Sequence, residues 1–170
     1  MAEQIYLCVS RNRKRVTYDP VDSHTATHFD DTLGLKALVI EAVEGLELNG
    51  ELGTEIDMGR IVGTSDVVDV DDSDEVVYGI RRNRDREGHA PFVKGRTGDP
   101  CPYVALHLVP QADGSYILSS TWIGTFSGDD EPFPNAPEAT ERSKDFWNKR
   151  AFVYGSQEIQ PGTETAVRPW

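Results

Sequence analysis

Two histidines and a hydroxyl-rich run are the residues of this sequence best suited to acid–base chemistry. His89 lies inside the basic segment GIRRNRDREGHAPFVKGR, and His107 lies in the β-rich run YVALHLV. The next β-rich run, YILSSTWIG, carries Ser119 and Ser120 side by side. An imidazole takes or gives a proton near neutral pH, so this set could act as general base and general acid without a metal ion. We take His89, His107 and Ser120 as the candidate catalytic residues.

Positive charge is concentrated in two places, although the chain has a formal net charge of −12. Four of its 17 Lys and Arg residues fall in RNRKR (residues 11–15) and six fall in residues 81–96. Local potential governs contact with a polyanion, so a basic patch on an acidic protein can still bind a phosphate backbone. A pair of solvated charged turns is the alternative. We expect substrate phosphates to be bound by Arg81, Arg82, Lys94 and Arg96.

These residue types together predict metal-independent cleavage of RNA. A base would remove the ribose 2′-hydroxyl proton, cations would hold the phosphate charge, and an acid would protonate the leaving oxygen. RNA is required because only RNA supplies that internal nucleophile. Two other classes stay open. An immunity-like or antitoxin-like module would bind a basic protein through the acidic residues 69–75. A small-molecule-binding domain would line a cleft with Trp122, Phe126 and Trp147.

Metal and cofactor chemistry have weaker support. His24 and His28 are spaced i, i+4, which on a helix would suit two metal ligands. Their stretch, SHTATH, is polar and has no apolar stripe, so we expect a loop and no metal. The acidic run DVVDVDDSDE lacks the Gly and Glu positions of a calcium loop, and a solvated turn is expected. The chain has no GxGxxG, GxxxxGK[ST] or GxSxG motif, so we expect no cofactor.

The elements that must position these residues are mostly short strands. We expect strands at residues 5–9, 16–19, 54–57, 61–70, 75–80, 103–109, 116–124 and 151–155. Asp113 and Gly114 predict a tight hairpin turn. One helix should begin behind a cap at Asp31 or Thr32 and end before Gly45, and a second should span 137–149.

Short strands that follow one another without long helical crossovers favour antiparallel pairing. The expected fold class is α+β: a mainly antiparallel twisted β-sheet packed by two α-helices, in a single domain over residues 1–170. Alternation along YVALHLV places His107 away from the more apolar face. On the next strand, alternation groups Ser119 with Thr121 and Ser120 with Trp122.

No window approaches the ~20 apolar residues of a membrane span, and the first residues lack the layout of a signal peptide. Cys8 and Cys101 fit buried thiols of a reducing compartment. We therefore expect a soluble, cytoplasmic protein without membrane association.

Several segments resemble a family of uncharacterised bacterial proteins with no assigned activity: EIDMGRIVGTSDVV, DEVVYGIRRNRD, FVKGR, GSYILSSTWIG and FWNKRAFVYGSQEIQPGTET. The resemblance runs over most of the chain after about residue 30. The family pattern has a His where this chain has Arg150. A more distant similarity is to the metal-independent ribonuclease toxins of the barnase and RelE type, whose pattern Leu-x-Thr-Ala-Tyr-x-Gly is similar to residues 118–124, with Ser120 in the Thr place. That similarity implies a ribonuclease-like fold and RNA as substrate.

Overall fold

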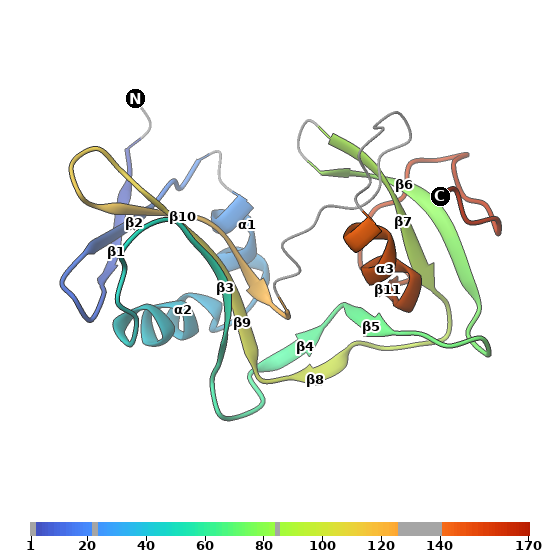
Figure 1. The fold of residues 1–170 in the computed structure, drawn as a ribbon, viewed down its shortest axis with the longest axis horizontal. Coiled ribbons are helices and arrows are strands. Elements are labelled where there is room, and N and C mark those ends of the chain that lie inside the picture. The colour runs from blue at the N-terminus through green and yellow to red at the C-terminus, as the bar shows by residue number, and fades with distance from the viewer. Residues whose placement is uncertain (1–2, 22–23, 84–85, 126–140) are drawn as a thin grey trace. The chain divides into compact units, whose positions relative to one another are not determined.

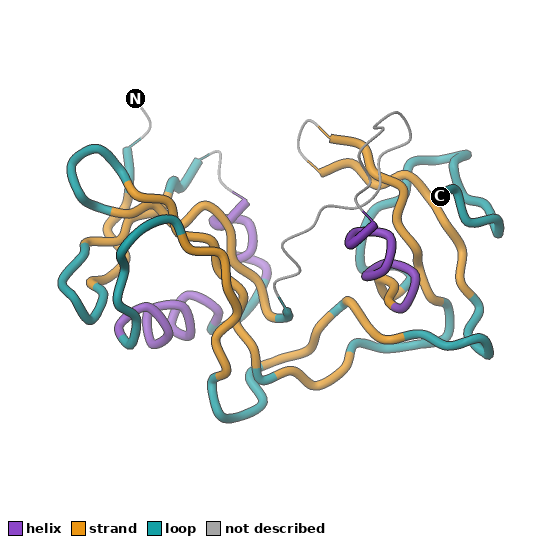
Figure 2. The backbone as a smooth tube through the Cα atoms, in the orientation of Figure 1, coloured by secondary structure: helices purple, strands orange, loops and turns teal. Residues whose placement is uncertain are grey.

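The computed structural model describes residues 3–21, 24–83, 86–125 and 141–170. It is a mixed α+β structure in which strands predominate, as Figure 2 shows. The chain divides into two compact units. Unit 1 comprises Met1–Gly63 and Pro100–Phe126, and unit 2 comprises Thr64–Asp99 and Ser127–Trp170. The single domain over residues 1–170 stays a prediction.

Unit 1 is built on a five-stranded sheet (Figure 1). The strands lie in the order β1 (Ile5–Val9), β2 (Arg15–Tyr18), β10 (Tyr116–Ile123), β9 (Tyr103–Pro110) and β3 (Leu52–Asp57). Neighbouring strands are antiparallel except for β2 and β10, which are parallel. Strands β1 and β2 form one hairpin, and the hairpin predicted at Asp113 and Gly114, β9–β10, is confirmed. In the second hairpin Gly114 has a φ of 83°, a conformation that glycine adopts without steric cost.

Two helices cover one face of this sheet, α1 (His24–Asp31) and α2 (Leu35–Glu44). Together they bury an aliphatic core, and its fully buried large side chains are Leu35, Val39, Val43, Leu48, Val104, Leu106, Leu108 and Leu118. The alternating Val104, Leu106 and Leu108 all point into this core, as period-two alternation predicts. The opposite face of β9, which carries His107, therefore looks away from the helices.

The sequence-based prediction for residues 24–34 was wrong in two respects. Residues 24–28 are helical rather than a loop, because α1 is held by packing on β10 rather than by an apolar stripe of its own. Its Thr25 is fully buried, and the hydroxyl donates to the carbonyl of Leu118 at 3.3 Å. The cap of α2 is Gly34, with a φ of 80°, and not Asp31 or Thr32.

Unit 2 has a four-stranded sheet in the order β5 (Val67–Asp69), β11 (Arg150–Val153), β7 (Arg86–Val93) and β6 (Val76–Asn83). Strands β7 and β11 are parallel, and the other pairs are antiparallel. Helix α3 (Glu141–Lys149) contributes Trp147 to a core with Phe92 and Phe152. The predicted helix at 137–149 is confirmed over 141–149, and its first residues lie outside the described part of the chain. The described residues thus form three helices instead of two.

The chain passes between the two units in β4 (Gly63–Ser65) and β8 (Asp99–Cys101), which pair with each other as a two-stranded sheet. The strand predicted over 61–70 is therefore two strands, β4 and β5. None of the described helices is long and apolar enough to cross a membrane.

The basic segment is a β-hairpin and not a charged loop. Most of residues 79–96 belong to β6 and β7, which pair from Val76 opposite Val93 to Asn83 opposite Arg86. The C-terminal segment then runs along β6, where Tyr78 and Thr165 exchange backbone hydrogen bonds of 2.7 Å.

Candidate acid–base site

His107 lies on β9 with its side chain 30% exposed, between two core leucines of the same strand. This placement on the less apolar face confirms the alternation predicted from the sequence. Gly53 pairs with His107 on the β3 side, so no neighbouring Cβ covers the imidazole there. The His107 imidazole is therefore partly exposed, which suits a group that exchanges protons with a bound molecule.

Both ring nitrogens of His107 have a close polar partner. Nδ1 lies 2.6 Å from the hydroxyl oxygen of Ser119, and Nε2 lies 2.8 Å from Oε1 of Glu51. The same Ser119 hydroxyl lies 3.3 Å from the carbonyl oxygen of His107 itself. The Glu51 side chain is 63% exposed, and it precedes β3 directly. A carboxylate, an imidazole and a hydroxyl therefore form one chain of hydrogen bonds across β3, β9 and β10.

A β-bulge aims Ser119 at the imidazole. The register of β10 against β9 shifts between Leu118, which pairs with Leu108, and Ser120, which pairs with His107. Ser119 is the extra residue, so both serines oppose the same histidine, as two bulge residues do. Because of this insertion, the predicted grouping of Ser119 with Thr121 was wrong, whereas Ser120 and Trp122 share a face as predicted. Ser120 shares the His107 face, and Thr121 turns into the interior, where its hydroxyl donates to the carbonyl of Ala105 at 2.8 Å.

The Ser119 hydroxyl can serve both protonation states of the imidazole. When His107 is neutral and its Nε2–H donates to Glu51, the bare Nδ1 accepts the Ser119 O–H. When His107 is protonated, Nδ1–H donates to the Ser119 oxygen, and the hydroxyl hydrogen rotates toward the carbonyl of His107. Neither state leaves a ring nitrogen without a partner, so the imidazole can change charge without a rearrangement of the backbone.

The three residues predicted to be catalytic do not share one unit. His107 and Ser120 are in unit 1, whereas His89 lies on β7 in unit 2, opposite Ile80. His89 is half-buried, and burial lowers the pKa of its imidazole below the ordinary value. Glu51 and Ser119 were missed as site residues. Glu51 is one acidic residue in a polar turn, and its sequence neighbours do not indicate its contact with His107. The orientation of Ser119 depends on a bulge, which the sequence pattern does not predict.

The described cations of the basic segment contact groups of unit 2. The guanidinium of Arg81 lies 4.8 Å from the centre of the Phe152 ring. Lys94 Nζ lies 5.0 Å from the Tyr154 ring centre and 3.9 Å from carboxylate oxygens of Glu75 and Glu164. These contacts stabilise unit 2, and phosphate binding by this segment stays a prediction.

Arg96 likewise binds within unit 2, with its Nη1 atom 3.2 Å from Oδ2 of Asp74. Arg82 is on β6, and its side chain lies outside the described atoms.

Unit 1 has a basic run of its own on the sheet that carries His107. Arg15 begins β2, and its guanidinium lies 5.7 Å from the centre of the Tyr6 ring. Because Val16 pairs with Tyr116, Arg15 lies beside the start of β10. Ser119 is three residues beyond Tyr116, a distance of about 10 Å at the usual rise of a strand. Arg15, the last residue of RNRKR, therefore provides positive charge on the same sheet, about four residues or roughly 13 Å before the bulge.

Two other expectations concern metals and aromatic residues. Among the described residues, no group of three or more His, Cys, Asp and Glu side chains could hold a metal ion. His24 and His28, for which no metal was expected, lie on α1, and the side chain of His24 is outside the described atoms. Of the predicted aromatic cleft, Trp122 is half-buried in unit 1, Trp147 is buried in unit 2, and Phe126 lies outside the described residues.

Comparisons of the chain with protein-family models, with curated proteins and with solved structures found no match.

Proposed function

We propose that unit 1 carries a metal-independent acid–base site and that its substrate is RNA. The observation that carries the proposal is the position of the His107 imidazole between Ser119 and Glu51, at 2.6 and 2.8 Å. In this contact the Glu51 carboxylate can act as the base and the protonated His107 imidazole as the acid, and one proton can pass between them. RNA cleavage needs this pair and no protein nucleophile, since the ribose 2′-hydroxyl attacks the neighbouring phosphorus.

In the proposed reaction, the two substrate oxygens replace the hydrogen bond between Glu51 and His107. The Glu51 carboxylate takes the 2′-hydroxyl proton, and the 2′-oxygen forms a bond to phosphorus while the bond from phosphorus to the 5′-oxygen breaks. Protonated His107 gives its Nε2 proton to the departing 5′-oxygen. Afterwards the proton on Glu51 returns to Nε2 when the contact of 2.8 Å forms again. The products are a 2′,3′-cyclic phosphate and a free 5′-hydroxyl.

The charges around the site support an approach of RNA from the β2 side. On the β3 side, Glu55 pairs with Ala105 and Asp57 pairs with Tyr103, so that edge adds negative charge to the face of His107. On the β2 side lie the exposed Arg13 and Arg15. A phosphate that flanks the cleavage point would contact this hairpin, and half-buried Trp122, beyond Ser120 on the same strand face, offers a ring on which a base can stack.

The acidic run of residues 69–75 gives less support to the alternative of a module that binds a basic protein. Asp69 and Asp74 already pair with Arg150 and Arg96 of the same unit, at 3.3 and 3.2 Å. A basic partner would have to displace these cations.

A pair of matched oligonucleotides tests the proposal. The full chain is incubated in chelator at low salt with a labelled single-stranded RNA and with the all-deoxy strand of the same sequence. We expect the RNA to be cut to 2′,3′-cyclic phosphate ends and the deoxy strand to stay intact. Cutting of both strands, or cutting of RNA to 3′-hydroxyl ends, would exclude the 2′-hydroxyl as nucleophile. No cutting and no RNA binding would remove the proposed function altogether.

A further inference from the structure

Unit 2 contains a small cavity that the acid–base site does not use. Its volume is about 210 Å³, and its lining comes from the turn after β5, from β6, β7 and β11, from the end of α3 and from the C-terminal segment. Drug-sized ligands occupy roughly 300–1,000 Å³, so the cavity suits a smaller molecule. Every lining residue belongs to unit 2, which makes this a site of one unit.

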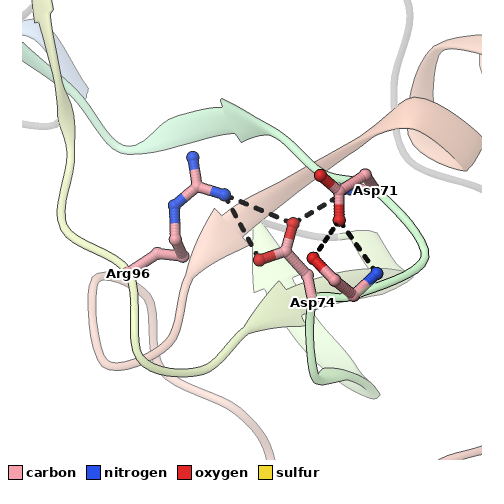
Figure 3. Close-up of polar contacts among 4 residues, drawn as sticks. Asp71, Asp74 and Arg96 are labelled. Carbon is pink, nitrogen blue, oxygen red and sulfur yellow. Dashed lines mark hydrogen bonds and ion pairs between the residues drawn. The ribbon is translucent and has the colours of Figure 1, made fainter.

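One part of the lining is an acidic turn, residues 71–74, which is held in a fixed conformation. The backbone N–H of Asp71 donates to Oδ2 of Asp74 at 2.9 Å, and Oδ1 of Asp71 accepts the Ser73 N–H at 2.9 Å. Figure 3 shows Arg96 reaching the Asp74 carboxylate beside this turn. Arg96, predicted to bind phosphate, thus orders the turn that presents Asp71, Asp72 and Asp74 to the cavity.

The remaining lining is cationic and aromatic. Arg168 Nε donates to the Tyr78 hydroxyl at 3.3 Å, and this bond places its guanidinium at the cavity. Arg150 is fixed by Asp69 at 3.3 Å and by the Phe146 ring, 4.5 Å from its guanidinium carbon.

Two side chains of the lining, one aromatic and one amide, are held by Trp170. Trp170 packs edge-on against Tyr78, with ring centres 5.5 Å apart, and its N–H donates to Asn148 at 2.9 Å. Both partners belong to the cavity lining, and so does buried Trp147. The cavity therefore has an apolar, aromatic part that is ordered before any ligand binds.

We infer that this cavity binds a small zwitterion of the amino-acid class. Its ammonium group would lie against the acidic turn, its carboxylate would take hydrogen bonds from Arg168 and Arg150, and its aliphatic part would contact Trp147. A singly charged molecule of this size would contact only one sign of the lining and gain only one set of charged hydrogen bonds, so it should bind more weakly. This inference does not depend on RNA cleavage, because the two sites lie in different units.

The test uses L-leucine and two molecules that each carry one of its charges, 3-methylbutylamine and 4-methylpentanoate. Each is titrated into the full-length protein at low salt, and binding is followed by calorimetry and by the NMR signal of the Trp147 indole N–H. We expect saturable leucine binding that moves this signal, and binding at least about tenfold weaker for the amine and for the carboxylate. No saturable shift with leucine, or equal affinity for 4-methylpentanoate, would overturn the inference.

Charge-removing variants then assign the binding to the cavity. Arg168→Gln and Asp72→Asn should each weaken leucine binding about tenfold, which corresponds to a loss of one charged hydrogen bond. The control variants Arg11→Gln and Glu47→Gln, from an exposed ion pair of unit 1, should bind leucine as the unaltered protein does. If Arg168→Gln disturbs the packing of Tyr78, Asp72→Asn still tests whether leucine binds in this cavity. Unchanged affinity in a folded Asp72→Asn variant would contradict the proposed place of the ammonium group.

Discussion

The hydroxyl oxygen of Ser119 lies 2.6 Å from Nδ1 of His107 and 3.3 Å from the carbonyl oxygen of the same residue. This double contact gives one hydroxyl two alternative directions for its hydrogen. It follows that His107 can be held in place both as imidazole and as imidazolium, which is the property required of a residue that passes a proton on.

We predict different effects for the two adjacent serines. Ser119→Ala removes the partner of Nδ1, so RNA cleavage should fall about tenfold and the pH dependence of the rate should shift, because the protonated imidazole loses an acceptor. Ser120→Ala is the matched control and should keep nearly full activity. The measurement is the cleavage rate of one RNA across pH for both variants. Equal losses, or a pH profile that does not move in Ser119→Ala, would contradict this assignment.

His89 should make unit 2 less stable in mild acid. Burial lowers the pKa of His89 in the folded protein below its ordinary value of 6.5, so the unfolded chain binds the proton more readily. The free energy of unfolding contributed by this residue is therefore fully present above about pH 6.5 and is lost as the pH falls toward the lower folded pKa. His89→Gln should flatten this acid-side loss, measured by denaturant unfolding at a series of pH values. A slope as steep as in the unaltered protein would show that other groups cause it.

Cys8 should be unreactive in the folded protein. Burial, reinforced by the charge of Glu44, raises the pKa of its thiol to about 11. At pH 8 only roughly one thousandth of the thiol would be thiolate, which is the reactive form. In a Cys101→Ala background, Ellman's reagent should react very slowly with the native protein and rapidly after denaturation. Rapid reaction of the native variant would contradict the burial of Cys8.

A methyl group at Gly79 should destabilise unit 2. A Cβ atom at this position would overlap Cγ2 of Ile159, which packs against β6. Gly79→Ala should therefore cost about 1–3 kcal/mol of unfolding free energy, as overpacking does. In an Ile159→Ala background the same change should cost much less, because the overlap is gone. Gly45→Ala is a control, since its Cβ would meet only an ordinary contact of 3.5 Å. Equal costs of Gly79→Ala in both backgrounds would show that Ile159 is not the cause.

Strand periodicity predicted the β9–β10 hairpin and the face of His107, because alternation is a local property of the chain. The bulge at Ser119 could not be predicted in the same way. Its register depends on pairing with β9, and one inserted residue placed Ser119 and Thr121 on opposite faces, although alternation had grouped them. Glu51 could not be recognised either, since its contact with His107 joins residues 56 positions apart.

The prediction missed helix α1 for a different reason. Its sequence is too polar to indicate a helix, and packing of Thr25 against β10 outweighs that local preference. The charge of residues 81–96 was evident from composition, but its contacts were not. The position of Arg96 beside Asp74 depends on pairing between segments 22 residues apart.

Cleavage of RNA by histidine variants is the most direct test of the central claim. The full chain, His107→Asn and His89→Asn are compared on the same labelled single-stranded RNA in the presence of chelator. Loss of the acid at the site should lower the rate of His107→Asn by about 10²–10⁴-fold, whereas His89→Asn should cleave at nearly the unaltered rate. Comparable activity of folded His107→Asn and the unaltered protein would contradict the account.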